Sequence, residues 1–419
     1  MTPPSAADAR NGTMNADRRV ARIAALAPVE AAAAWFLAHE EDLILRQIEV
    51  TRIPAPPFGE AARAEWLAAR FRELGLEDVQ IDDIGNVIAV RPGTATADPK
   101  FIALTAHIDT VFPSGTVVNV RRESNRLYGP GISDNGAGIT ALLALAGALQ
   151  HAAIRTETSL LFIGNVGEEG EGDVRGMRYL FAEPRWRDAI AATLVLDGAG
   201  TDTVVTEALG SKRFLVSIHG PGGHSWSDFG TANPIVMLAR AIDLFARTPV
   251  PTSPKTTFNI GVINGGTSVN SIPESASIKV DIRSATGEQV ERLERALRDA
   301  VERAIAEEPR TAYGGRAHSG VLADVKLIGS RPAARLNPES PMLAVLHAVD
   351  ALLDNTARPQ RASTDANIPL SQNREALAIG AGGAGGGAHT LHEWYDPTGR
   401  DLGLRRILLT ALTIAGVIE

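Results

Sequence analysis

The chain has no cysteine among its 419 residues. This absence excludes disulfide bonds, thiolate zinc sites, iron–sulfur clusters and cysteine nucleophiles, so any metal ion must be bound by His, Asp or Glu side chains. Aromatic residues are scarce at 5%, whereas hydrophobic residues make up 44% of the chain and the mean hydropathy is −0.01. Such values are typical of a globular protein rather than a disordered or membrane-spanning one.

An excess of positive charge is also lacking. Lys and Arg total 41 against 49 Asp and Glu, which gives a formal net charge of −8. We therefore expect no surface that binds nucleic acid or a membrane. Pro28 and Glu30 interrupt the Ala-rich N-terminal stretch before an apolar segment of signal-peptide length can form. We expect a cytoplasmic protein in which residues 1–30 form a loose N-terminal tail.

Strand and helix patterns alternate through the first half of the chain. Short apolar runs bounded by Gly, Asp or Pro are typical of buried strands, and apolar residues at helical spacing lie between them. This alternation predicts a three-layer α/β domain, and the chain is long enough for a second domain. The predicted helices span residues 60–74 and 135–150, and the predicted strands span residues 86–90, 101–105, 159–163 and 193–196.

The order of elements changes after Gly210. The pattern becomes β-α-β-β-α-β, which is typical of a ferredoxin-like α+β module, and the α/β pattern resumes after Pro332. We therefore predict a module at residues 211–332 inserted into a catalytic α/β domain made of residues 31–210 and 333–419. The strands of the module are predicted at residues 213–219, 257–263, 277–282 and 321–328, and its helices at residues 234–246 and 288–306.

Acidic and imidazole side chains follow four of the predicted strands. Each has an ordinary structural interpretation when taken alone: a helix N-cap, a solvated acidic loop or a turn residue. Taken together they are more informative, because the carboxyl ends of parallel strands are where open α/β sheets place their sites. The residues concerned are His107, Asp109, Asp134, Glu168, Glu169, Asp197 and His389.

A glycine-rich segment precedes His389. Gly380, Gly382 and Gly385 satisfy the G-x-G-x-x-G pattern, but too little chain follows them to build a nicotinamide-binding fold. We interpret these glycines as making room for a substrate beside His389.

Two imidazoles and three or four carboxylates without thiols suit a site for two divalent metal ions. Zinc is the default, with cobalt or manganese as alternatives. Two such ions lower the pKa of a bridging water and polarise a carbonyl group, and a carboxylate that binds no metal can then take up the proton. The residue types therefore predict hydrolysis of an amide bond.

The chain resembles the co-catalytic zinc peptidase and deacylase family that includes peptidase T, aminoacylase, acetylornithine deacetylase and succinyl-diaminopimelate desuccinylase. The resemblance lies in segments that occur in the family's order over nearly the whole chain. It implies a three-layer catalytic domain with an inserted lid and dimerisation domain, and therefore a homodimer. The segments are Ala106-His107-Ile108-Asp109, Ser133-Asp134-Asn135-Gly136, Gly167-Glu168-Glu169-Gly170, Asp197 and His389.

The resemblance also implies the role of each residue in the site. Glu168 would be the general base that takes a proton from the metal-bridging water and returns it to the leaving amine. Asp109 would orient a ligand histidine. The first metal ion would be bound by His107, Asp134 and Asp197, and the second by Asp134, Glu169 and His389, with Asp134 as the bridge.

The last metal ligand has two candidates, His389 and His392. Similar proteins place a Glu four residues after the ligand histidine, and Glu393 fits only His389. His389 is therefore preferred, and His392 stays an alternative.

Three residues of the inserted module resemble the family's substrate-binding positions. His224 would reach the scissile carbonyl, in some relatives from the partner subunit, and would stabilise the developing oxyanion. Asn270 and Arg283 would bind substrate, although an ion pair within the protein explains Arg283 equally well. A further segment, residues 363–367, resembles one near the family's site, but we assign it no role.

The identity of residue 197 bears on the substrate. Within the family this carboxylate tends to be Asp in aminopeptidase-like and dipeptidase-like members and Glu in many deacylases and carboxypeptidases, so Asp197 favours a di- or tripeptide aminopeptidase. An N-acyl-amino-acid deacylase is the alternative, and Asn135-Gly136-Ala137 departs from the Met/Lys-Gly-Gly pattern of deacylases. A catalytically silent peptide-binding protein on the same fold is disfavoured, because it would have no need of Glu168.

Overall fold

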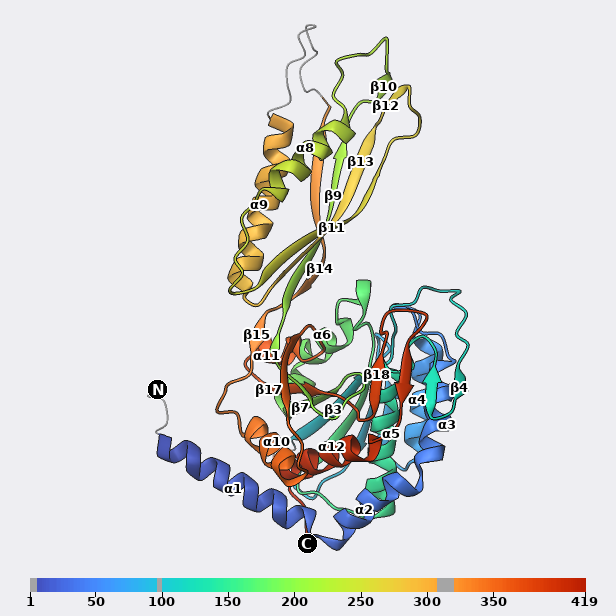
Figure 1. Cartoon of the computed structure of the whole chain (residues 1–419), viewed down its shortest axis with the longest axis vertical. Helices are drawn as coiled ribbons and strands as arrows, with labels where there is room; N and C mark the ends of the chain where they lie inside the picture. Colours follow the sequence, from blue (N-terminus) through green and yellow to red (C-terminus); the bar gives the residue numbers. More distant parts are fainter. Residues whose placement is uncertain (1–5, 96–99, 307–319) are drawn as a thin grey trace. The chain divides into compact units, whose positions relative to one another are not determined.

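The computed structural model describes residues 6–95, 100–306 and 320–419. The chain divides into two compact units (Figure 1). Unit 1 is Met1–Ala208 with Arg335–Glu419, and unit 2 is Leu209–Ala334.

The helices of unit 1 include four that precede the first strand. The helices are α1 (Ala6–Ala24), α2 (Ala27–Ala38), α3 (Glu40–Thr51), α4 (Ala61–Glu73), α5 (Gly136–His151), α6 (Arg175–Ala182), α7 (Pro184–Ala189), α10 (Pro341–Leu352), α11 (Asn367–Ser371) and α12 (Arg400–Ala415), with a 3-10 turn at Gly170–Gly172. The strands are β1 (Glu77–Ile81), β2 (Val87–Arg91), β3 (Phe101–His107), β4 (Arg121–Glu123), β5 (Arg126–Tyr128), β6 (Ser159–Asn165), β7 (Ile190–Leu196), β8 (Thr203–Ala208), β15 (Ala334–Arg335, at the boundary with unit 2), β16 (Arg358–Ala362), β17 (Glu375–Ile379), β18 (Ala384–Gly386) and β19 (Trp394–Asp396).

The main sheet of unit 1 has the strand order β1-β2-β6-β3-β7-β17-β8-β15, with β16 beside β8. Its central strands β6, β3, β7 and β17 run parallel. Their carboxyl ends therefore meet at one edge. On one face, side chains of β2, β3 and β6 pack with α6 and α7 in a buried apolar cluster. On the other face, Leu67 of α4 lies so close to Gly164 that a Cβ there would approach it to 2.3 Å.

Helix α5 is a central helix of unit 1. All of its residues from Gly136 to Leu149 are buried, which explains why its sequence is apolar on every side. Asn135 caps its N-terminus by accepting a hydrogen bond from the Gly138 backbone N–H at 3.0 Å. Asp134 therefore stands immediately before the first turn of a helix that the core holds in place.

A second, small sheet with the order β18-β19-β5-β4 belongs to the same unit. Trp394 of β19 pairs with Tyr128 of β5. This pairing joins the C-terminal segment that contains His389 to the loop that leads into Asp134, although the two lie far apart in the sequence.

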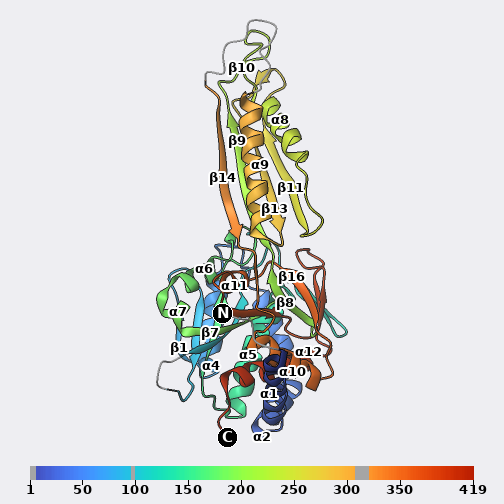
Figure 2. The same ribbon diagram turned by 90° about the vertical axis from the view of Figure 1, so that its left-hand side faces the viewer.

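Unit 2 is an antiparallel sheet with the order β11-β13-β9-β14, covered on one face by α8 and α9 (Figure 2). Every second residue of β9 from Phe214 to Ile218 is buried, as expected for a sheet with one covered face. The elements are β9 (Gly210–His219), β10 (Gly223–His224), α8 (Pro234–Ala246), β11 (Thr256–Gly265), β12 (Ser271–Ile272), β13 (Ser275–Ser284), α9 (Gly287–Ala306) and β14 (Leu322–Arg331).

The predicted fold class is confirmed: a layered α/β unit carries an inserted α+β unit, in which the four strands of the sheet and the two helices follow the order β-α-β-β-α-β. The expectation of a loose N-terminal tail is wrong. Residues of that segment form α1 and the start of α2, and α1 packs against α10 and α12. Val20 and Ile23 are buried there, so apolar contacts stabilise a helix that the local pattern did not reveal.

Within the described residues, no single helix is long and apolar enough to cross a membrane. The segments Asn15–Ala24 and Ala27–Ala38 reach the required length and hydropathy only as a pair, which is bent by 69°.

Candidate metal centre

His107 is the last residue of β3 and is buried among carboxylates. Its Nδ1 lies 3.2 Å from the backbone oxygen of Asp109 and 3.5 Å from that residue's Oδ1. Its Nε2 lies 3.0 Å from Oδ1 of Asp134 and 3.8 Å from Oδ1 of Asp197. The end of the β3 strand thus presents one imidazole nitrogen toward two carboxylates, while the other faces the protein.

The Asp134 carboxylate lies between two imidazoles. Its Oδ1 faces His107, and its Oδ2 lies 3.2 Å from Nε2 of His389. The same nitrogen of His389 lies 3.1 Å from Oε1 of Glu169. Two groups of potential metal ligands therefore share Asp134, and within each group the ligand atoms all lie within 4.8 Å of one another: His107, Asp134 and Asp197 in the first, and Asp134, Glu169 and His389 in the second.

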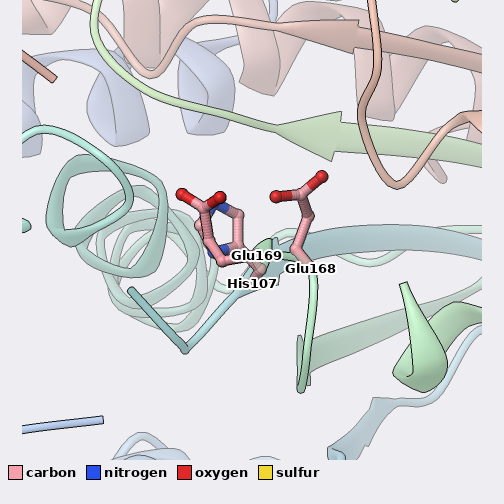
Figure 3. A group of neighbouring side chains, drawn as sticks. All are labelled: His107, Glu168 and Glu169. Atoms are coloured by element: carbon pink, nitrogen blue, oxygen red, sulfur yellow. The ribbon is translucent and has the colours of Figure 1, made fainter. Parts of the chain in front are cut away.

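Glu168 and Glu169 follow strand β6 and are both buried. Figure 3 shows the two side chains extending to the same side, with that of Glu169 drawn over the His107 ring. Each offers an oxygen within 4.8 Å of a His107 nitrogen. Two adjacent buried carboxylates are costly unless cations neutralise them, so the arrangement fits a cation site.

The electrostatics of the metal-free side chains agree with this interpretation. Burial alone would lower the pKa of His107, but hydrogen bonds to carboxylates, that of Asp109 first, raise it well above its usual value. Hydrogen bonds to Asp134 and Glu169 raise the pKa of His389 to about 10. Although burial opposes ionisation of Asp134, the two imidazoles lower its pKa. The centre therefore attracts positive charge, and its N/O ligand set without sulfur suits zinc, cobalt or manganese.

Asp109 contacts the backbone of both glutamates as well as His107. Its Oδ1 accepts a hydrogen bond from the backbone N–H of Glu168 at 2.9 Å, and its Oδ2 accepts one from that of Glu169 at 2.8 Å. Behind it, the buried Arg63 donates to the backbone oxygen of Ile108 at 2.9 Å. Burial lowers the pKa of Arg63 to about 10, while the charge of Asp109 opposes this shift. Asp109 thus positions both glutamates through their backbone.

Glu393 holds the loop that carries Asp134. It is fully buried, and its carboxylate accepts three backbone hydrogen bonds, from Gly131 at 2.8 Å, Ser133 at 2.8 Å and Asp134 at 2.7 Å. Burial raises the pKa of Glu393 to about 7, although these N–H donors act in the opposite direction. The spacing of Glu393 from His389 indicates which histidine is the ligand, but no local pattern predicts the contact of Glu393 with this loop.

Asn135 connects the turn of Asp134 to the turn of Asp197. Its Nδ2 donates to the backbone oxygen of Leu196 at 2.9 Å, and its Oδ1 accepts from the backbone N–H of Gly198 at 3.1 Å. One side chain therefore binds the backbone on both sides of Asp197. No local pattern in the sequence predicts these contacts of Asn135.

Segment 363–367, which had no assigned role, supplies a buried carboxylate beneath the first ligand group. Oδ2 of Asp365 accepts a hydrogen bond at 2.7 Å from Asn165, the residue opposite His107 in the parallel β3–β6 pair. Burial raises the pKa of Asp365 to about 7, and the charge of His107 opposes that shift. This long-range contact has no periodic signal in the sequence.

The turn before Glu168 is supported by an ion pair. Glu60 is buried and accepts two hydrogen bonds from Arg175, at 2.8 and 2.9 Å. Gly167 has a φ of +65°, and a Cβ there would come within 1.9 Å of the Arg175 guanidinium. Glycine is therefore required at this position by both conformation and space.

The predicted substrate-binding residues lie in unit 2. His224 is exposed on β10, and its Nδ1 accepts a hydrogen bond from the backbone N–H of Trp226 at 3.1 Å. Asn270 lies close by, because its backbone oxygen accepts from the Ser225 N–H at 3.0 Å. Arg283 donates to Asp281 at 2.7 Å, so it takes part in an ion pair within the protein, which is the alternative given for it above.

His389, not His392, joins the candidate ligands; no ligand group within the described residues includes His392. The expectation that the preceding glycines make room for a substrate is not supported, because they closely approach the protein itself. A Cβ at Gly385 would lie 2.3 Å from the Ser133 hydroxyl, and one at Gly382 would lie 2.6 Å from the backbone oxygen of Arg400.

Two family models match the chain. Residues 86–214 match peptidase family M28, and residues 206–309 match a peptidase dimerisation domain. The first range contains five of the six ligand and base candidates, all but His389, and the second lies almost wholly in unit 2.

Curated relatives match part of the chain. A probable carboxypeptidase of Aspergillus clavatus is 32% identical over 253 residues, which are 55% of this chain and 55% of that protein. The uncharacterized protein YqjE of Bacillus subtilis is 27% identical over 299 residues, which are 67% of this chain and 75% of that protein. The chain spans about half the length of the first curated relatives that it matches.

Solved structures share the fold over most of the chain. Aminopeptidase PepT of Bacillus cereus has a TM-score of 0.69 at 22% identity, covering 90% of this chain and 99% of that one. A tripeptidase of Staphylococcus aureus has a TM-score of 0.71 at 21% identity, with coverages of 90% and 98%. An amidase of the hydantoinase/carbamoylase family from Burkholderia vietnamiensis has a TM-score of 0.67 at 19% identity, with coverages of 90% and 97%.

Proposed function

We propose that the chain is a metallopeptidase of the co-catalytic zinc type with two divalent ions, zinc by default, and its two family-model matches and its fold support this proposal. The observation that carries the proposal is the position of Asp134. One oxygen faces His107 and the other faces His389, so the two ligand groups share this carboxylate. His107, Asp134 and Asp197 would hold one ion, and Asp134, Glu169 and His389 the other.

Two ions bound at this centre would supply Lewis-acid polarisation of the substrate carbonyl and a water of lowered pKa. Glu168 is the general base in this proposal: its carboxylate takes a proton from the attacking water and returns it to the leaving amine. It is supported by its burial beside the ligand groups and by the Asp109 carboxylate, which holds its backbone N–H. Asp109 positions His107 and the Glu168–Glu169 turn together.

We further propose that the substrates are di- or tripeptides with a free amino terminus. Asp197 as the ligand of the first ion supports this, as do the names of two structural neighbours, an aminopeptidase and a tripeptidase. Several curated relatives are named probable carboxypeptidases, so release from the carboxyl end is a second candidate. Deacylation of N-acyl amino acids is the alternative on the same centre. The substrate-binding roles of His224, Asn270 and Arg283 stay predictions from the sequence.

A homodimer through unit 2 is part of the proposal. The match to a peptidase dimerisation domain supports it, and so does a set of exposed apolar side chains on α8 and the edge strand β11. Packing of this set against a second copy would remove it from water. The exposed residues are Ile235, Val236, Val262 and Ile263.

The test is a matched panel of free dipeptides, free tripeptides, amino-terminally blocked peptides and N-acyl amino acids, assayed before and after chelation and after zinc or cobalt is restored. The proposal expects chelator-sensitive cleavage of the free peptides, with the amino-terminal residue released. Cleavage of blocked peptides with release of the carboxyl-terminal residue would favour a carboxypeptidase. Cleavage restricted to N-acyl amino acids would favour a deacylase, and turnover that survives complete chelation would contradict the metal centre.

A further inference from the structure

The C-terminal segment that contains His389 also contains Glu393, and both side chains contact Asp134. The His389 imidazole faces Oδ2 of Asp134, while the Glu393 carboxylate accepts from the Asp134 backbone N–H. The Glu393 backbone oxygen also accepts from the Gly129 N–H at 3.0 Å. Glu393 is thus bound to both ends of the loop that leads to the shared carboxylate.

We propose that Glu393 is a positioning residue: by accepting hydrogen bonds from three backbone N–H groups of this loop, it fixes the direction in which the Asp134 carboxylate faces the two ligand groups. The proposal rests on the proposed function, because it assigns Glu393 a part in binding both ions. It concerns geometry alone, since Glu393 belongs to none of the ligand groups within the described residues.

The hydrogen-bond pattern explains why a carboxylate stands at this position. Oε1 accepts from both Ser133 and Asp134, and Oε2 accepts from Gly131. Only a group with acceptors on both oxygens satisfies all three donors, because a glutamine amide would place its own N–H opposite one of them. A buried anion next to the Asp134 carboxylate is electrostatically unfavourable. Its presence is easier to explain if bound cations offset the repulsion than if it only stabilises the loop.

The contacts also indicate what the removal of Glu393 would change. Asp134 precedes α5, whose N-terminus is held separately by Asn135. Loss of the Glu393 contacts therefore frees the loop before the helix and leaves the helix capped. Since Asp134 is shared, both ligand groups would be affected, whereas substitution of His389 would affect only the second.

The experiment is calorimetric titration of zinc into metal-free protein, together with thermal unfolding of the metal-free protein, for wild type, Glu393→Gln and Glu393→Asp. Loss of a residue that orients ligands typically lowers metal affinity about 10–100-fold. We expect a decrease in this range at both sites for Glu393→Gln. We expect a smaller decrease for Glu393→Asp, which keeps both acceptor oxygens. Cobalt bound to the variant should also show an altered visible spectrum.

Asp350→Asn is the matched control. Asp350 is a buried carboxylate that accepts two hydrogen bonds from Arg406, at 2.6 and 2.8 Å, and neither residue belongs to the ligand groups within the described residues. Its substitution should lower thermal stability and leave zinc affinity unchanged. Wild-type zinc affinities in both Glu393 variants would overturn the inference. If Glu393→Gln does not fold, the result for Glu393→Asp decides. Failure of wild type to bind two ions would instead refute the proposed function itself.

Discussion

Replacement of Asp109 by Asn changes one oxygen of a buried carboxylate into a donor. If Oδ1 keeps its contacts with His107 and the Glu168 N–H, the new amide group faces the Glu169 N–H, which then lacks an acceptor. A hydrogen bond to a charged group contributes about 1.5–3 kcal/mol, and each 1.4 kcal/mol corresponds to about tenfold. The buried Arg63 also loses a nearby opposite charge. We therefore expect kcat/KM to decrease about 10–100-fold, within the usual range for a residue that orients metal ligands.

The assay is steady-state hydrolysis of the best peptide in the panel, with zinc affinity measured on the same preparations. The zinc affinity of Asp109→Asn should decrease along with kcat/KM, because Glu169 is a proposed ligand. Asp350→Asn again controls for the loss of a buried carboxylate as such. If Asp109→Asn had wild-type kcat/KM and wild-type zinc affinity, the hydrogen bonds to Glu168 and Glu169 would have no functional role and the reasoning would be refuted.

Three further predictions concern other parts of the molecule. Asn135→Leu removes the α5 cap and both contacts around Asp197, so the metal-free protein should lose about 1 kcal/mol or more of stability by thermal unfolding and bind the first ion more weakly; an unchanged first site would contradict the link. Ile263→Arg places a charge in the exposed apolar set of unit 2 and should convert a dimer to a monomer in sedimentation, and a dimer that persists would place the interface elsewhere. Burial favours a higher pKa for Glu294, but hydrogen bonds from Lys212 and Arg298 outweigh burial and lower the pKa from 4.5. The ionised Glu294 therefore stabilises the folded protein above pH 4.5, and this stabilisation is lost as the pH falls through the pKa of the folded state. Glu294→Gln should therefore lower the unfolding temperature at pH 7 and have little effect at pH 3, and an equal effect at both would refute the assignment.

Much of the fold could be predicted because its signals are local. The α8 helix begins and ends where its Asn cap and apolar spacing indicate, and the central strands β3 and β6 are apolar runs that end in the polar residues His107 and Asn165. The N-terminal helix α1 was missed because its stability depends on α10 and α12, which lie more than three hundred residues away. No pattern within residues 1–30 contains that information.

The candidate site likewise contains residues that local sequence signals predict and residues that they do not. His107, Glu168, Glu169 and Asp197 were predictable because they lie at or shortly after the carboxyl ends of β3, β6 and β7, which run parallel to one another. The contacts of Glu393, Asn135 and Asp365 were not. These three side chains bind backbone or amide groups that come close only in the folded chain. In the sequence, a buried acid or amide looks the same whether it caps a turn or supports a metal ligand.

The most direct test of the central claim is a count of bound zinc per chain, with turnover measured on the same samples, for wild type, Glu168→Gln and His389→Ala. Because the two ligand groups share Asp134 and the proposed base Glu168 lies outside both, we expect two ions and full activity in wild type and two ions without turnover in Glu168→Gln. We expect one tightly bound ion in His389→Ala. A single ion in active wild type would contradict the account, and so would loss of both ions in Glu168→Gln, because Glu168 would then be a ligand rather than the base.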